Sequence, residues 1–296
     1  MPDACAMKYL VAIVGPTATG KSAFALRLAG GLTGAVIISA DSRQVYRGLD
    51  IGTAKPTAEE RGRVRHELID VVDADQSFSL ANYQRLAYQA IDRAEKPFLV
   101  GGTGLYLQAV LDGFVLPAAP PDPELRSSDL PTAELLERLR ALDPAAAEGI
   151  DAANRRRLLR ALERAGRGQP ARWPRYRDLR IGLTAPREVL YRRSDQRVDS
   201  MLEQGWLDEV RALLRHYPPG LPALTGLGYS ELAEHVSGRL SLAEAVDLVK
   251  RRTRQFIKRQ LTWFRRDQRI HWFDVTQPGW IAQAIELLGT VWRLER

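Results

Sequence analysis

The stretch "YLVAIVGPTATGKSAFALRLAG", at residues 9–30, is the most informative part of the sequence for the fold. An apolar run at 9–14 leads into a glycine-rich loop at 15–22, and a helical stretch follows that loop at once. The loop matches the pattern G-x-x-x-x-G-K-[ST] in the strand–loop–helix context that the pattern requires. Its glycines allow backbone N–H groups to surround phosphate oxygens, and the N-terminus of the following helix adds its dipole. The stretch therefore predicts a P-loop that binds a chain of phosphates.

The P-loop predicts phosphate and magnesium, but it does not by itself predict a nucleoside triphosphate. Lys21 supplies a positive charge, and the Ser22 hydroxyl is placed to ligate Mg²⁺, the expected cofactor. In ordinary P-loop NTPases a second strand ends in an acid that holds the metal. Here the run at 97–100 ends in Gly-Gly-Thr, and the well-placed acid is Asp41, which closes the run at 35–41. The guanine-reading motif Asn-Lys-x-Asp is absent, which argues against a GTPase, while a small-molecule or nucleotide kinase remains the alternative.

Strand-like and helical runs alternate along the rest of the chain. We expect strands at 9–14, 35–41, 68–73, 97–104, 179–186 and 269–275, and helices at 22–32, 79–95, 132–142, 153–166, 187–203, 206–215 and 241–266. This alternation predicts an α/β fold, a P-loop NTPase-like parallel sheet with helices on both faces. A helical block at 120–168 follows a proline-rich stretch, and we expect it to be a small helical insertion domain. The core domain would then comprise 7–119 and 169–296.

Composition narrows the class of protein. Of the 296 residues 45% are hydrophobic, which is enough for a packed core. The single cysteine, Cys5, cannot form an internal disulfide or a cysteine zinc site, which suits a reducing cytoplasm. The first residues lack the pattern of a signal peptide, and no apolar stretch approaches membrane-spanning length. We therefore expect a cytoplasmic protein that does not bind membranes.

Positive charge is concentrated in two windows. The net charge is +7, but residues 155–180 carry ten arginines against two acids, and residues 250–269 carry nine Lys or Arg against one acid. Such windows with few compensating acids indicate a polyanionic partner rather than an ordinary solvated helix face.

Together, five blocks make the sequence similar to a known family, the bacterial tRNA dimethylallyltransferases, also called tRNA isopentenylpyrophosphate transferases. The blocks are "GPTATGKS" (15–22), "ADSRQVYRGLDIGTAKP" (40–56), "GGTGLYLQAVLDG" (101–113), "TGLGYSEL" (225–232) and "RRTRQFIKRQLTWFR" (251–265). The family transfers a dimethylallyl group from its diphosphate to N6 of the adenosine just 3′ of the anticodon. The resemblance thus implies two partners, dimethylallyl diphosphate and a tRNA anticodon stem-loop. With one cysteine the chain lacks the zinc finger of eukaryotic relatives, and we expect a monomer.

The resemblance assigns roles at the reaction centre. The whole P-loop would bind the donor diphosphate: Gly15, Pro16, Thr17, Ala18, Thr19, Gly20, Lys21 and Ser22. Asp41 would be the general base, because the exocyclic amine of adenine is a poor nucleophile and must lose a proton as the C–N bond forms. Thr103 would contact the reacting adenosine. Arg197 would reach the diphosphate, although Arg193, one helical turn earlier, is an alternative.

The resemblance also implies how the tRNA is held. The target adenine would be flipped out of its stack, and the amide of Gln44 would read an adenine edge. At Ser230 this sequence departs from the family pattern, because some members have arginine at that position. Phe256 and its apolar neighbours are expected to pack on the core, and Trp263 is expected to do so rather than stack on a base. The expected tRNA-binding residues are Asp41, Ser42, Arg43, Gln44, Thr103, Arg126, Arg156, Arg157, Leu158, Leu159, Arg160, Gly228, Tyr229, Lys258, Arg259, Gln260 and Arg265.

Two further alternatives remain open. An isopentenyltransferase that acts on a free nucleotide would share the donor chemistry but would not need two basic windows. An RNA-binding module without activity would not need Lys21, Ser22 and Asp41.

Overall fold

The computed structural model describes residues 7–116, 122–165 and 171–292. The chain divides into two compact units, one formed by Met1–Asp112 with Pro174–Arg296 and the other by Gly113–Trp173. The domain boundaries expected at 119/120 and 168/169, like Cys5, lie outside the described residues. Each unit has its own hydrophobic core and is described by itself.

The first unit is built on a six-stranded sheet in the order β3-β2-β4-β1-β5-β6, in which every pair is parallel. The strands are β1 Tyr9–Val14, β2 Ala35–Ser39, β3 Arg65–Glu67, β4 Lys96–Val100, β5 Arg177–Thr184 and β6 Ile270–Asp274. The parallel α/β sheet expected from the sequence is confirmed. The strand expected at 68–73 is wrong, because Leu68 and Asp70 have φ of 64° and 57°, which interrupts extended backbone. Val72 forms only an isolated bridge with Tyr46.

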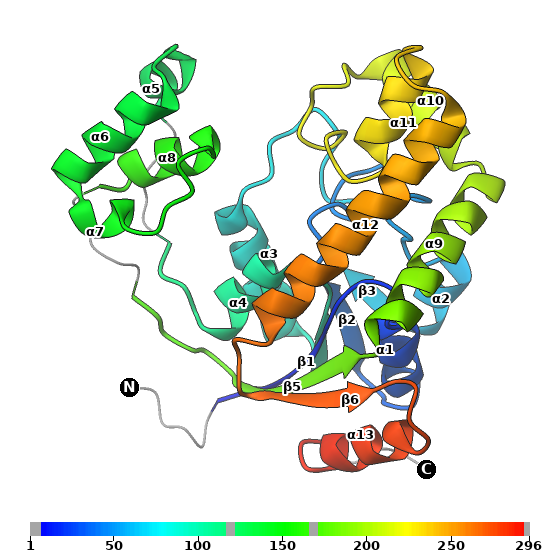
Figure 1. The fold of residues 1–296 in the computed structure, drawn as a ribbon. Helices are drawn as coiled ribbons and strands as arrows, with labels where there is room; N and C mark the ends of the chain where they lie inside the picture. Colours follow the sequence, from blue (N-terminus) through cyan, green and yellow to red (C-terminus); the bar gives the residue numbers. More distant parts are fainter. Residues whose placement is uncertain (1–6, 117–121, 166–170, 293–296) are drawn as a thin grey trace. The chain divides into compact units, whose positions relative to one another are not determined.

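Helices cover both faces of the sheet (Figure 1). Val11 and Ile13 of β1 pack in one core cluster with α1 Lys21–Ala29 and α13 Trp280–Gly289. The alternate residues of β1 pack in the other cluster with α3 Leu80–Arg93 and α4 Gly104–Leu111. Side chains of a strand point to opposite faces in turn, so a strand that is apolar throughout must be covered twice.

A third cluster joins the segment after β2 to the helices of the C-terminal half. It includes Val45, Leu49, Trp206 and Tyr229, all buried. The helices that contribute to this cluster are α9 Arg187–Glu203, α10 Trp206–His216, α11 Tyr229–Val236 and α12 Leu242–Phe264, whereas the short helix α2 Ala58–Arg63 contributes none of its residues. This packing holds the 40–56 segment close to the sheet edge where the P-loop lies.

The second unit is helical. It contains α5 Pro123–Ser127, α6 Thr132–Leu142, α7 Pro144–Ala147 and α8 Arg155–Leu162. Its core is formed by Leu135 and Leu139 of α6 with Leu158 and Leu159 of α8. In the part of the chain that the structure describes, no helix has the length and apolar character needed to cross a membrane.

Candidate active site

The P-loop follows β1 and has the backbone geometry that its glycines allow. Gly15 has a φ of 137°, and a Cβ there would lie 2.3 Å from the carbonyl oxygen of Leu183. Gly20 caps α1 in the left-handed region, with a φ of 84°. The Thr19 hydroxyl donates to the carbonyl oxygen of Pro16 at 2.9 Å, which closes the loop on itself. Only glycine fits the first of these positions, so the motif is a requirement of the local packing as well as of phosphate binding.

Asp41 and Thr103 lie together at the carboxyl edge of the sheet. Strand β4 lies between β1 and β2, so its loop separates the P-loop from the segment that carries Asp41. The Thr103 N–H donates to the carbonyl oxygen of Ala40 at 3.1 Å, and the Ser42 N–H donates to Thr103 Oγ1 at 3.0 Å. Ligands of open α/β sheets bind at this edge. The sheet order therefore brings together three loops that are far apart in the sequence.

One carboxylate oxygen of Asp41 has a structural task. Oδ1 accepts from the N–H groups of Arg43, at 2.8 Å, and Gln44, at 3.4 Å, and so caps the turn after β2. Oδ1 therefore caps the turn, while Oδ2 has no hydrogen-bond partner among the described residues.

Two cations lie on the P-loop side of Asp41. The pKa of Lys21 is lowered to about 7, chiefly by burial and next by the charge of Arg197, against the opposing effect of Asp41. Burial also lowers the pKa of Arg197, and Asp41 opposes this. The Lys21 ammonium donates to the carbonyl oxygen of Pro16 at 2.6 Å. Arg193 is exposed, whereas Arg197 is half-buried and close enough to influence Lys21, so the geometry favours Arg197 as the partner of the loop.

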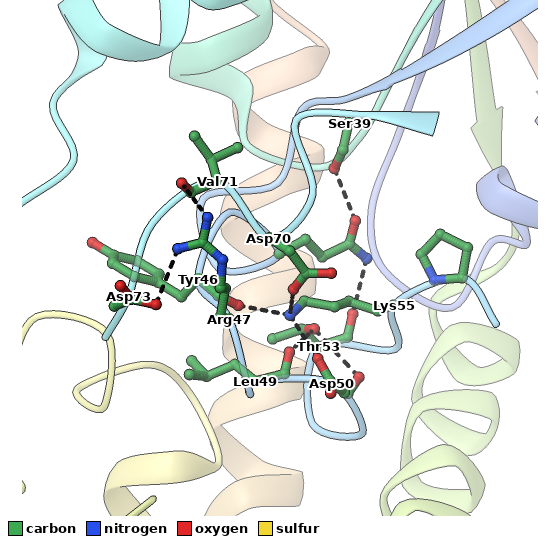
Figure 2. A network of polar contacts seen from close by, with 12 residues as sticks. Ser39, Tyr46, Arg47, Leu49, Asp50, Thr53, Lys55, Asp70, Val71 and Asp73 are labelled. Atoms are coloured by element: carbon green, nitrogen blue, oxygen red, sulfur yellow. Dashed lines mark hydrogen bonds and ion pairs between the residues drawn. The ribbon is translucent and has the colours of Figure 1, made fainter. Parts of the chain in front are cut away.

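The segment after β2 is held by a network of polar contacts (Figure 2). The Gln44 amide accepts from the Ser39 hydroxyl at 2.8 Å and donates to the carbonyl oxygens of Thr53 and Ala54. The Lys55 ammonium lies at the centre, with Asp50 at 2.6 Å, Asp70 at 2.5 Å and the carbonyl oxygen of Tyr46 at 2.6 Å; its side chain is 2% exposed.

This network is closed from the other side by Glu209 of α10. Its carboxylate accepts from the N–H groups of Asp50, Ile51 and Gly52 at 2.9, 2.7 and 3.3 Å. It also accepts from the Tyr229 hydroxyl at 2.6 Å. A half-buried carboxylate with four donors fixes the position of the loop that it holds.

Gln260 of α12 joins two loops of the site. Its Oε1 accepts from the Thr17 N–H at 2.9 Å, and its Nε2 donates to the carbonyl oxygen of Gly102 at 2.9 Å. The side chain is only 6% exposed. Gln260 therefore connects the P-loop to the loop after β4.

A cavity of about 910 Å³ lies beside the site, between residues 50–61 and α9. Its lining includes Lys55, Arg61, Arg197 and Met201. Arg197 thus lines this cavity, and its charge also lowers the pKa of Lys21.

Comparison with known proteins identifies the family. The model of the IPP transferase family matches residues 44–267. The chain belongs to the IPP transferase family. It is 46% identical to a tRNA dimethylallyltransferase of Thermomicrobium roseum, over 94% of this chain and 90% of that protein. It is 48% identical to a tRNA dimethylallyltransferase of Moorella thermoacetica, over 90% of each. The resemblance found in the sequence is confirmed.

Solved structures give the same result for this member of the family. The tRNA isopentenylpyrophosphate transferase of Bacillus halodurans superposes with a TM-score of 0.74, at 42% identity over 96% of each chain. A eukaryotic dimethylallyltransferase acting on tRNA superposes with a TM-score of 0.83, at 24% identity over 98% of this chain and 81% of that one, and shows the shared fold.

Several residues expected to contact tRNA are bonded or packed within the protein. The Gln44 amide, expected to read an adenine edge, has both ends engaged in the loop network. Tyr229 is 1% exposed and bonded to Glu209. Leu158 and Leu159 form the core of the second unit. In this structure these side chains, like that of Gln260, are engaged by other parts of the protein, and their contacts with tRNA stay predictions.

The remaining members of that set differ in exposure. Those that are exposed are Arg156, Arg157, Lys258, Arg259 and Arg265. Arg126 and Arg160 both pair with the buried carboxylate of Glu163, at 2.7 and 2.9 Å. Arg43 donates to the carbonyl oxygens of Pro222 and Ala223. Gly228 is the N-cap of α11, and a Cβ there would lie 2.1 Å from the Trp206 ring.

Two expectations about α12 are also wrong. Phe256 is 36% exposed and Trp263 is 37% exposed, although both were expected in the core. The buried face of the helix is formed by other residues, among them Ile257, Gln260 and Leu261. The extent of the buried face depends on which segments pack against α12. These segments lie elsewhere in the chain, so the sequence of the helix alone does not predict where the buried face ends.

The surroundings of Ser22 are compatible with Mg²⁺. Its hydroxyl is exposed at the first turn of α1, beside the loop. Among the described residues no group of three or more His, Cys, Asp or Glu could hold a metal by itself. Mg²⁺ commonly takes one or two protein ligands and completes its shell with phosphate oxygens and water. A single hydroxyl next to a phosphate loop matches that pattern.

Proposed function

We propose that this chain is a tRNA dimethylallyltransferase, which transfers a dimethylallyl group from dimethylallyl diphosphate to N6 of the adenosine 3′ of the anticodon. One observation carries the proposal: the P-loop with its two cations opens beside Asp41 and Thr103 at one edge of the sheet. A site for a diphosphate next to a carboxylate suits alkylation of a weak nitrogen nucleophile. Membership of the IPP transferase family supports the same reaction.

The donor's diphosphate would lie in the loop formed by residues 15–22. Backbone N–H groups, Lys21 and Arg197 would stabilise the negative charge that develops on the leaving group. Ser22 would hold Mg²⁺, which neutralises part of the diphosphate charge when it is bound. The cavity between residues 50–61 and α9 gives the donor a route to Arg197.

Bond formation joins N6 of adenine to C1 of the dimethylallyl group. The bond between C1 and the diphosphate oxygen breaks, and its electron pair leaves with diphosphate. Oδ2 of Asp41 accepts the proton of N6 as the amine bonds to carbon. Thr103, which is fixed between Ala40 and Ser42, orients the adenosine.

A small-molecule or nucleotide kinase is the competing function, and one assay separates the two. The chain is incubated with Mg²⁺, dimethylallyl diphosphate and an anticodon stem-loop that carries adenosine at the target position, and the RNA is digested. We expect prenylated adenosine in the digest. Turnover of free AMP, or phosphoryl transfer from ATP without RNA, would contradict the proposal. A cytoplasmic location and a monomeric state remain predictions.

Binding of the donor should take up a proton at pH 8. With a pKa of about 7 the Lys21 amine is mostly neutral at that pH, and a diphosphate beside it raises this pKa again because the charged form is favoured. We expect uptake of about one proton per donor bound at pH 8 and little at pH 6. Donor affinity should therefore fall as pH rises above 7.

Calorimetry in buffers of different ionisation enthalpy measures this uptake directly. Lys21→Met should abolish the uptake, because it removes the titrating group. A donor affinity that stays constant between pH 6.5 and 8.5 would show that Lys21 does not change its protonation on binding.

Cations on α12 should set the salt dependence of tRNA binding. Lys258 and Arg265 are exposed, and each phosphate contact adds about 0.7 to 0.9 to the slope of log affinity against log salt. We expect Lys258→Ala with Arg265→Ala to lower this slope by about 1.5 in total. Arg239→Ala serves as the control, because Arg239 lies in the turn between α11 and α12, is paired with Glu234 and is almost twenty residues before Lys258. An unchanged slope in the double variant would place this part of α12 away from phosphate.

A further inference from the structure

Trp263 lies against the loop that carries Thr103. A Cβ on Gly104 would lie 2.3 Å from both Cδ1 and Nε1 of Trp263, so the indole edge rests directly on the Gly104 backbone. Gly104 is the first residue of α4, and Thr103 is its N-cap. Gln260, almost one turn earlier on α12, is bonded to Gly102 of the same loop. Helix α12 thus contacts this loop twice. Gln260 is bonded to Gly102, and the indole of Trp263 packs on Gly104.

The indole is not enclosed by this contact. Trp263 is 37% exposed, whereas Trp206, which also packs on glycines, is 2% exposed. No side-chain hydrogen bond is formed by Trp263 with any other described residue. One surface of the ring therefore packs on protein and another remains open to solvent.

The exposed surface around Trp263 is aromatic and cationic. Phe256 lies two helical turns before Trp263 on the same face of α12, and the guanidinium of Arg259 lies 5.8 Å from the centre of the Phe256 ring. Leu105, next to Gly104, is 44% exposed. Lys258 and Arg265 are exposed near the same end of the helix. Exposed aromatic rings among cations are the means by which proteins bind unstacked RNA bases.

We propose that Trp263 stacks on an RNA base that neighbours the target adenosine. This inference rests on the proposed function, because it takes the RNA substrate as given. A base displaced when its neighbour is flipped out loses its own stacking partner, and the open face of the indole replaces that partner. The prenyl group of the donor is a poorer occupant, because an apolar group of five carbons needs enclosure and the ring is bordered by cations at the surface.

A cycle of two changes tests the stacking. The target stem-loop is prepared intact and with an abasic nucleotide on the 5′ or the 3′ side of the adenosine, and binding is measured without donor. Removing the stacked base should weaken binding to the wild-type chain by about 5- to 150-fold. Trp263→Leu should weaken binding of intact RNA by a similar factor and should be insensitive to the abasic change. Trp263→Phe should keep most of the affinity and the sensitivity.

Two results of these measurements would contradict the stacking of Trp263 on an RNA base. Equal losses for intact and abasic RNA in Trp263→Leu, for both neighbours, would overturn the proposal and leave a packing role. A raised KM for dimethylallyl diphosphate with unchanged RNA affinity would place the indole on the donor instead. The thermal midpoint of each variant, measured by circular dichroism, detects loss of folding, and Trp263→Phe keeps the test valid if the leucine variant is unstable. Prenyl transfer by the wild-type chain is measured in parallel, so that failure of the proposed function is separated from failure of the stacking.

Discussion

Asp41→Asn is expected to lower the rate of prenyl transfer by about 10²- to 10⁴-fold, the range typical of a general base. Asparagine keeps an oxygen at the position of Oδ1, which accepts from the N–H groups of Arg43 and Gln44 and caps the turn. It replaces Oδ2 with an NH₂ group, which cannot accept the proton of N6. The affinity for the anticodon stem-loop should therefore stay close to that of the wild-type chain. Single-turnover transfer and equilibrium RNA binding measure the two effects separately.

Asp41→Ala provides the comparison for this experiment. Alanine removes the base and the cap together, so the turn at Arg43 and Gln44 loses its acceptor and the RNA affinity falls as well. If the asparagine variant loses RNA affinity as severely as the alanine variant, or transfers at the wild-type rate, Asp41 has a structural role only.

Gln260→Leu is expected to lower kcat/KM for the donor by about 10²-fold. The side chain joins the Thr17 N–H to the Gly102 carbonyl, and leucine leaves both groups without a partner in a buried place. The P-loop and the loop before Thr103 then lose their fixed separation, which misplaces the donor relative to the adenosine. Steady-state kinetics should show the effect mainly in the donor parameters, while RNA affinity is preserved.

Arg259→Ala is the matched control, because Arg259 is the exposed neighbour of Gln260 on α12. Its loss should weaken RNA binding and leave the donor KM unchanged. A Gln260→Leu variant that behaves like Arg259→Ala would mean that the glutamine contacts RNA after all.

The local part of the site could be predicted from the sequence. The order of glycines, Lys21 and Ser22 specifies a phosphate loop, since these residues act through their own backbone and side chains within eight positions. Strand and helix periodicity specified the parallel sheet, and the similarity to a family specified the reaction. Arg197 was preferred to Arg193 through the resemblance to the family; its charge acts on Lys21 in the structure, and its contact with the diphosphate stays a prediction.

The roles of several individual side chains could not be predicted. Gln44 and Tyr229 lie in segments that resemble RNA-contacting segments, but each is bonded to protein across a distance in sequence. Glu209, which holds three backbone N–H groups of the 50–52 loop, carried no recognisable signal. A carboxylate on an amphipathic helix looks the same in the sequence whether it faces solvent or a loop from another part of the chain.

The P-loop, the alternation of strands and helices and the family can be identified from the sequence, because they depend on residues that are close in the chain. Which side chains are exposed and which are buried depends on contacts between distant segments, and these are seen in the folded protein. Burial of Gln260 and exposure of Trp263, three residues apart on α12, depend on the loop after β4 that the helix crosses. That loop lies more than 150 residues earlier in the chain. The free energy of such a contact depends on how both segments pack in the folded protein.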